Sequence, residues 1–110
     1  MTGVELIAKE RQRQQDAEGY DVEHDDGHTL GALAMAAALY AIASTGERLH
    51  KVCVHERSVD WFDPWPWDPE DDKRPKRYPD TPTRRQQMRL LTKAGALIAA
   101  ELDRVQRIKA

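Results

Sequence analysis

The chain has 110 residues, 40% of them apolar and 33% charged, and a formal net charge of −2. This length allows one compact domain without a second independent core, and the slightly acidic balance argues against a protein that coats DNA. The single cysteine, Cys53, cannot form an internal disulfide and has no second cysteine with which to bind zinc, which fits a reducing compartment.

The sequence indicates neither a signal peptide nor a membrane span. Residues 1–15 contain no apolar run of signal-peptide length before the charges begin. The longest apolar stretch, residues 30–43, is alanine-rich and too short to cross a bilayer. We therefore expect a cytoplasmic protein with no membrane partner and no specific nucleic-acid partner.

Residues 4–18 predict a first helix whose inner face changes character halfway along. Val4, Ile7 and Ala8 form an apolar face at helical spacing. Polar residues then continue the same rows: Arg11, Gln14, Gln15 and Glu18. Such a helix either emerges into solvent or lines a wet cleft, and emergence is the simpler interpretation. Gly19 is expected to end the helix.

The stretch EHDDGH, residues 23–28, places two histidines and three acids within six positions. We expect it to form the loop and first turn that lead into a second helix, with Asp26 or Thr29 capping the free N–H groups. Capping does not explain two histidines and a second aspartate. Capping alone and capping combined with ligand contact are therefore weighted equally, with at least one of His24 and His28 facing a cleft.

A metal site in EHDDGH is the minority interpretation. His24 and His28 could share a helical face, but Gly27 between them disfavours the helix that this requires. Asp25 and Asp26 could supply two magnesium ligands, yet residues 29–45 carry no acid that could join them. We assign no metal ligand, no catalytic residue and no cofactor.

The second helix is expected at about 28–44. Leu30, Leu33, Ala37 and Tyr40 lie on one face, and the run contains almost no polar side chain. Most of its circumference is therefore expected to be buried, with the alanines allowing neighbouring helices to approach closely.

An irregular connection is expected at 46–80. Residues 49–55 leave strand and helix open, although the sequence Val-Cys-Val at 52–54 favours a short strand. The following WFDPWPWDP has three prolines in nine residues and predicts a loop. Six acids between Asp60 and Asp72 then give way to seven basic residues between Lys73 and Arg89.

The third helix is predicted at about 82–109, with Thr81 as its cap and Pro82 at its first position. A continuous apolar stripe runs along it: Met88, Leu91, Ala94, Ile98, Leu102, Val105 and Ile108. Leu90 and Leu97 widen this stripe, so we expect the middle of the helix to be covered on two sides. Lys93 lies on that widened flank, where it either snorkels to water or meets an anion.

The predicted fold is a mainly α-helical single domain over residues 1–110, with three principal helices and an irregular Trp/Pro-rich connection in which one short β-strand is an open alternative. Three helices with an alanine-rich middle member bury little area alone. We therefore expect a homo-oligomer that uses exposed parts of the second and third helices.

Tryptophans followed by cations form the second candidate site. Trp61, Trp65 and Trp67 precede Lys73, Arg74, Lys76 and Arg77, a combination that suits a base and a phosphate. For two of the three tryptophans, covering the core is the favoured interpretation. The proline of WPW is expected to present at least one tryptophan outward as a binding anchor.

Several segments resemble, in order, a group of small, mostly uncharacterised proteins encoded in bacteriophages and prophages: ERQRQ, EHDDGH, GALAMAAALYA, WPWD and KAGALIAAELDR. The resemblance covers most of the chain. More distantly, the first helix, polar loop and GxLAxAA helix resemble the first half of MazG-type nucleotide pyrophosphatases. Those enzymes hold magnesium with a glutamate-rich ExxE helix, whereas positions 30–43 contain no acid. This likeness implies nucleotide binding without hydrolysis.

The leading functional hypothesis is a phage-type protein that sequesters a small anionic nucleotide-like molecule, such as a host-defence signal, in the host cytoplasm. The candidate anion contacts are Arg11, Lys73, Arg77 and Lys93, the stacking face is Trp65 or Trp67, and the polar contacts are His24, Asp25, Asp26 and His28. A second hypothesis is an inhibitor of a host protein that acts through the acidic segment 60–72. A third is a metal-dependent nucleotide hydrolase that uses the EHDDGH carboxylates.

Overall fold

The computed structural model describes residues 1–56, 58–76 and 81–108, and the side chains of 51–55 and 59–61 lie outside that description. It confirms the mainly helical class. The described elements, in chain order, are α1 (Gly3–Ala17), α2 (Val22–Asp26), α3 (Ala32–Ala43), β1 (Lys51–His55), β2 (Ser58–Phe62), a short 3-10 turn (Pro69–Asp71) and α4 (Arg84–Arg107).

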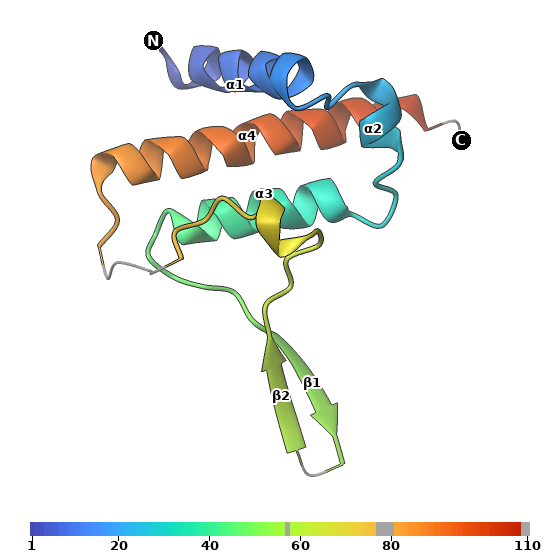
Figure 1. The fold of residues 1–110 in the computed structure, drawn as a ribbon, viewed down its shortest axis with the longest axis vertical. Helices are drawn as coiled ribbons and strands as arrows, with labels where there is room; N and C mark the ends of the chain where they lie inside the picture. Colours follow the sequence, from blue (N-terminus) through green and yellow to red (C-terminus); the bar gives the residue numbers. More distant parts are fainter. Residues whose placement is uncertain (57, 77–80, 109–110) are drawn as a thin grey trace.

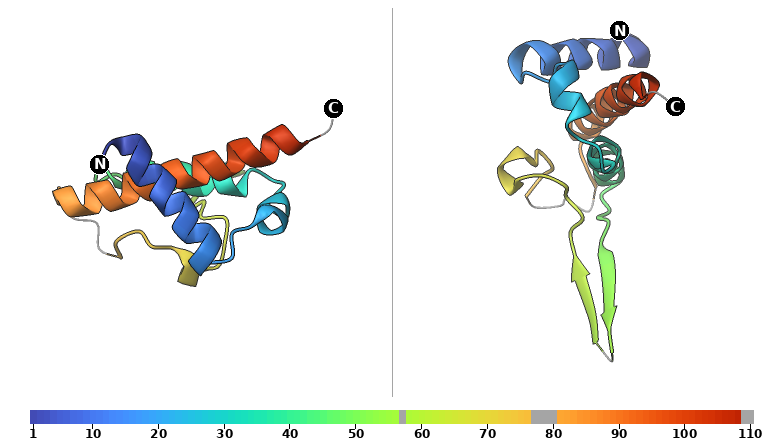
Figure 2. Two further views of the ribbon diagram at one scale, coloured as in Figure 1. Left: turned by 90° about the horizontal axis from the view of Figure 1, so that it is seen from above. Right: turned by 90° about the vertical axis from the view of Figure 1, so that its right-hand side faces the viewer.

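The helix α4 lies in the middle of the helical body (Figure 1). Seen from above, α1 crosses over α4 at an angle, while α3 runs along the opposite side of α4 (Figure 2). The short helix α2 lies beside the C-terminal half of α4, and the β1–β2 hairpin projects away from the body. This arrangement places the polar half of α1 near the turn at Pro69–Asp71.

Small and aliphatic residues build the contact between α3 and α4. Leu33, Ala37 and Tyr40 of α3 are buried against Ala94 and Leu97 of α4. Alanines on both helices let the two backbones approach closely, which is the role expected of the alanine-rich run. Trp65 and Trp67 are half-buried against the same cluster, as predicted for two of the three tryptophans.

The predicted apolar stripe of α4 does not face the core. Apart from Ala94, its members are 43–59% exposed: Met88, Leu91, Ile98, Leu102, Val105 and Ile108. The buried row is displaced by about one position and contains Leu90, Ala94, Leu97 and Ala100. The flank that was expected to widen the stripe is the one on which α3 packs. Because α1 crosses α4 on another side, the expected coverage of the helix on two sides is confirmed.

A glycine allows α1 to cross α4. A Cβ atom built on Gly95 lies 2.5 Å from Cδ1 and 2.6 Å from Cγ1 of Ile7. Any side chain at position 95 therefore requires Ile7 to move.

The helix starts differ from those predicted. A capping box of Thr83 and Gln86 opens α4, so this helix starts two residues after the expected position. EHDDGH belongs largely to the separate helix α2, whose N-cap is Asp21. The prediction that Asp26 or Thr29 caps the next helix was wrong, because α3 starts after Gly31 (φ 74°) without a side-chain cap. Leu30, which was assigned to the core face, is 97% exposed.

The connection between α3 and α4 contains more regular structure than expected. The strand predicted at Val52–Val54 is confirmed as part of β1, but it pairs with β2 in an antiparallel hairpin that the sequence analysis missed. After the hairpin, Arg74 is buried and binds two carboxylates, with distances of 2.9 Å to Asp63 and 2.7 Å to Asp72. Its guanidinium also lies 5.3 Å from the ring centre of Trp65. These contacts fix the course of the Trp/Pro-rich segment against the helical body.

Candidate ligand-binding cleft

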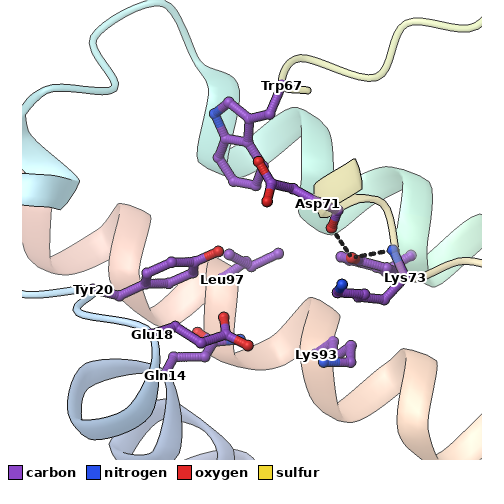
Figure 3. A pocket seen from close by; sticks show the side chains of 9 residues that line it. Gln14, Glu18, Tyr20, Trp67, Asp71, Lys73, Lys93 and Leu97 are labelled. Carbon is purple, nitrogen blue, oxygen red and sulfur yellow. Dashed lines mark hydrogen bonds between the residues drawn. The ribbon is translucent and has the colours of Figure 1, made fainter. Parts of the chain in front are cut away.

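Two adjoining hollows lie where α1, α4 and residues 67–73 meet. The first has a volume of about 280 Å³, and its lining residues are Gln14, Glu18, Tyr20, Tyr40, Trp67, Asp71, Lys73, Lys93 and Leu97. Trp67 and Asp71 enter it from one side, and Tyr20, Glu18 and Gln14 enter it from the opposite side (Figure 3). The hollow thus has aromatic walls with charged groups at its margin.

The second hollow continues the first and is richer in cations. It has a volume of about 520 Å³ and shares Glu18, Lys73 and Lys93 with the first hollow. Arg13 and Arg89 are its additional cations, and Glu10 is its additional acid. Four cations against two carboxylates leave this end with a positive balance, whereas Tyr20, Tyr40 and Trp67 gather at the other end.

Glu10 organises the α1 wall of the cleft. Its carboxylate accepts hydrogen bonds from Arg13 at 2.7 Å and from the Gln14 amide at 3.2 Å, and it lies 3.7 Å from the Lys93 ammonium. Burial opposes its charge, but the hydrogen bond from Arg13 and the charge of Lys93 outweigh burial and lower the pKa of Glu10. Lys93 therefore meets an anion, which resolves the alternative that the sequence left open.

The amide of Gln14 has a defined orientation. Its Nε2 donates to Glu10, so the opposite atom, Oε1, points away from that carboxylate. The side chain is only 3% exposed, and Oε1 has no hydrogen-bond partner within the part of the chain that the structure describes. A buried acceptor without a partner is costly, so this atom is a candidate contact for a ligand N–H group.

Tyr40 fixes the opposite wall. Its hydroxyl donates to the Asp71 carbonyl at 3.5 Å and accepts from the Lys73 backbone N–H at 3.0 Å (Figure 3). Burial raises the pKa of Tyr40 to about 12, and burial likewise raises the pKa of Tyr20 to about 12. Both hydroxyls are therefore protonated at neutral pH. The proton of Tyr40 is already donated to the Asp71 carbonyl, so its hydroxyl can only accept a further hydrogen bond.

A chain of polar contacts links α1, α2 and Trp67 behind this cleft. The fully buried Asp25 accepts from Arg11 at 2.8 Å and contacts His24 Nδ1 at 3.0 Å. His24 Nε2 lies 3.3 Å from His28 Nε2, and His28 Nδ1 accepts from the Trp67 indole N–H at 3.1 Å. A further hollow lies in front of these rings, lined by Tyr20, His24, His28, Trp67, Asp68 and Asp71.

The predicted site residues fall into three groups. Trp67, Lys73 and Lys93 line the first hollow, and His24 and His28 line the hollow beside it. Arg11 and Asp25 face each other behind the cleft, the exposed Asp26 pairs with Arg107 at 2.8 Å, and Trp65 packs on Tyr40 with a centroid distance of 5.5 Å. Arg77 lies outside the described residues.

Sequence reasoning missed several residues of the cleft: Glu10, Arg13, Tyr20, Tyr40 and Arg89 as lining groups, and Gln14 as a buried acceptor. The polar second half of α1 was the available signal. Of its two interpretations, a helix that lines a cleft is the one that the structure supports.

Comparison with known proteins identifies no relative of this chain. No family model matches the chain, and neither the curated proteins nor the solved structures contain a significant match. Among residues 1–56, 58–76 and 81–108, no cluster of three or more His, Cys, Asp or Glu side chains is arranged to hold a metal ion. Within the same ranges, no helix has both the length and the apolarity needed to span a membrane.

Proposed function

We propose that the protein binds and sequesters a small anionic nucleotide-like molecule in this cleft without consuming it. The observation that carries the proposal is the continuity of the two hollows, one with Tyr20, Tyr40 and Trp67 and the other with Arg13, Arg89 and the shared lysines. A nucleotide needs this combination, because its base stacks on aromatic faces and its phosphates bind cations.

The polar groups between the two ends add directional contacts. Gln14 Oε1 is an unpaired acceptor, whereas the hydroxyl of Tyr20 is a donor at neutral pH. Asp71 puts negative charge at the aromatic end, which suits the N–H groups of a base and repels a phosphate, whereas Glu18 is shared by both hollows and accepts from Arg13. We infer that the base lies at the aromatic end and the phosphates lie near Lys73 and Lys93.

The two alternative functions have less support. The inhibitor hypothesis needs free acids in segment 60–72. Asp63 and Asp72 are both bound to the buried Arg74, which leaves the exposed Asp68, Glu70 and Asp71 for this role among the described side chains. The hydrolase hypothesis needs the EHDDGH carboxylates to hold a metal, but Asp25 is bound to Arg11 and Asp26 pairs with Arg107. Within the described residues, no group of three or more His, Cys, Asp or Glu side chains is arranged to hold a metal ion.

Native mass spectrometry of the protein purified from cells tests the proposal directly, because it detects a co-purified ligand and the subunit number together. Recovery of an intact nucleotide-like molecule after denaturation is the expected result, and the subunit number tests the expected homo-oligomer. Calorimetry should follow with ATP, GTP, NAD, 3′,5′-cyclic AMP and 3′,5′-cyclic GMP. Conversion of any of these during incubation contradicts sequestration.

Two lysine variants provide a matched comparison. Lys93→Gln removes a cation from the cleft, and we expect affinity to fall roughly 10-fold or more, as for loss of a charge-assisted hydrogen bond. Lys9→Gln removes the same charge from an exposed position of α1 outside the hollows, and we expect little change. Equal effects of the two substitutions indicate only a general electrostatic attraction and contradict this site.

A further inference from the structure

The hydrogen-bond chain from Trp67 to Asp25 has only one consistent arrangement of protons. The indole N–H can only donate, so His28 Nδ1 is the acceptor and carries no proton. Neutral His28 then carries its proton on Nε2 and donates to His24 Nε2. His24 in turn carries its proton on Nδ1 and donates to the Asp25 carboxylate. All three contacts are satisfied only when both imidazoles are neutral.

One additional proton on either ring breaks this arrangement. A proton on His28 Nδ1 faces the indole N–H of Trp67, so two donors then oppose each other 3.1 Å apart. A proton on His24 Nε2 faces His28 Nε2–H, and if His28 moves its own proton to Nδ1, the conflict passes to Trp67. Protonation of the pair therefore acts on the residue that forms an aromatic wall of the cleft.

We propose that His24 and His28 are positioning residues that hold Trp67 in the cleft while they are neutral and release it when either is protonated, so that acidification weakens ligand binding. The effect on ligand binding rests on the proposed function. The coupling of Trp67 to the histidines does not, because it is a property of the ligand-free protein.

Several groups around the two rings set the balance between the neutral and the charged pair. Tyr20 stacks on His24, with a centroid distance of 4.2 Å. Negative charge faces the rings from α2, from α4 and from the segment after Trp67, through Asp25, Glu101, Asp68 and Asp71. On the far side of Asp25, Arg11 neutralises this carboxylate and itself lies 3.7 Å from Asp103, while Arg107 pairs with Asp26.

The environment of His28 favours the neutral form. Burial, followed by the proximity of His24, lowers the pKa of His28, and the charges of Asp25 and Glu101 only partly oppose this. A histidine with a lowered pKa in the folded state contributes its full stabilisation above the unfolded value of about 6.5. That contribution is lost as the pH falls below this value, so the position of Trp67 is expected to be fixed at neutral pH and loosened in mild acid.

The test combines three variants with one probe. His28→Asn keeps an acceptor near the position of Nδ1 but cannot titrate in this range, and Trp67→Phe keeps an aromatic ring but removes the N–H group. His50→Asn is the control for loss of a histidine at an exposed position. The probe is 3′,5′-cyclic AMP, because its phosphodiester charge is constant between pH 5.5 and 7.5, and circular dichroism checks that the fold persists at both values.

In the ligand-free protein, the NMR signal of the Trp67 indole N–H is identified by its absence in Trp67→Phe. We expect this signal to shift between about pH 7.5 and 5.5, near the histidine range, in the wild type and in His50→Asn but not in His28→Asn. A signal that does not respond to pH in the wild type overturns the coupling of Trp67 to the histidines.

With cyclic AMP, we expect wild-type affinity to fall roughly 3- to 10-fold over this range, the effect of losing one hydrogen bond. The affinity of His28→Asn is compared between its own two pH values and should change by less than about 2-fold, since asparagine still accepts from the indole and does not titrate. A pH-responsive Trp67 signal with equal affinity at both values overturns the release step. If no nucleotide of the calorimetric panel binds, the proposed function fails, while the NMR result still decides the coupling.

Discussion

The two sides of α4 are held by different chemistry. On one side, α3 packs through Leu33, Ala37 and Tyr40 against an aliphatic row with no charged group. On the other side of α4, near its C-terminal end, hydrogen bonds of Arg11, Asp25 and the two histidines join α1 and α2 to each other and to Trp67. The first contact depends on volume, whereas the second depends on charge and on the direction of each hydrogen bond. We therefore expect stability to be concentrated in the α3–α4 contact, and the proposed sensitivity to ligand and pH to be concentrated at the α1–α2 end.

The largest expected effect comes from a cavity in the α3–α4 contact. Leu33 is fully buried, so Leu33→Ala should lower the free energy of unfolding by roughly 2–5 kcal/mol. Leu33→Met nearly conserves the volume and should cost less than about 1.5 kcal/mol. Urea denaturation measures both. Equal losses from the two substitutions would show that this contact depends on more than volume.

The next largest effect is expected from the polar end. Asp25→Ala leaves the Arg11 guanidinium, which is 12% exposed, without its buried partner and with only the half-exposed Asp103 at 3.7 Å, and we expect a loss of roughly 3 kcal/mol by urea denaturation. The double variant Arg11→Met with Asp25→Leu should recover most of this loss, because no uncompensated charge remains. Both the single and the double variant remove the acceptor of His24. We therefore expect both to change the NMR signal of the Trp67 indole N–H, and the double variant should not restore it. Full restoration of that signal would place the pH-sensitive contact elsewhere.

A smaller effect is expected where α1 crosses α4. Gly95→Ala places a methyl group against Ile7, and we expect a net loss of roughly 1 kcal/mol because overpacking exceeds the gain in helix propensity. The second-site change Ile7→Ala should relieve the clash, so the double variant should be more stable than the sum of the single losses predicts. Purely additive losses in a double-mutant cycle would contradict the direct contact.

The smallest effect is expected at Asp26, which caps no helix and pairs with Arg107 at the surface. Asp26→Asn should leave the thermal midpoint and nucleotide affinity unchanged, because exposed ion pairs contribute little. Thermal unfolding and calorimetry measure this. A clear loss of affinity without a loss of stability would restore Asp26 as a ligand contact.

The same contrast explains which features the sequence predicted. Helical periodicity identified the helices, because burial of Leu33 or Leu97 depends on spacing within one element. It did not identify which flank of α4 is buried, because that depends on where α3 packs. For EHDDGH the sequence left capping alone and capping with ligand contact open. The acceptor role of His28 depends on Trp67, which lies 39 positions away in the sequence. Such a partner cannot be inferred from local spacing.

The base of the β1–β2 hairpin has a practical consequence for protein engineering. Asp63, just after the hairpin, binds Arg74 at 2.9 Å and lies 3.4 Å from Arg48, just before the hairpin. These ion pairs hold the two ends of the hairpin together at the edge of the helical body, and the hairpin itself projects away from that body. The exposed Glu56, at the far end of the hairpin, is therefore suited to carry a fluorophore, an affinity tag or a surface attachment point away from the helical body.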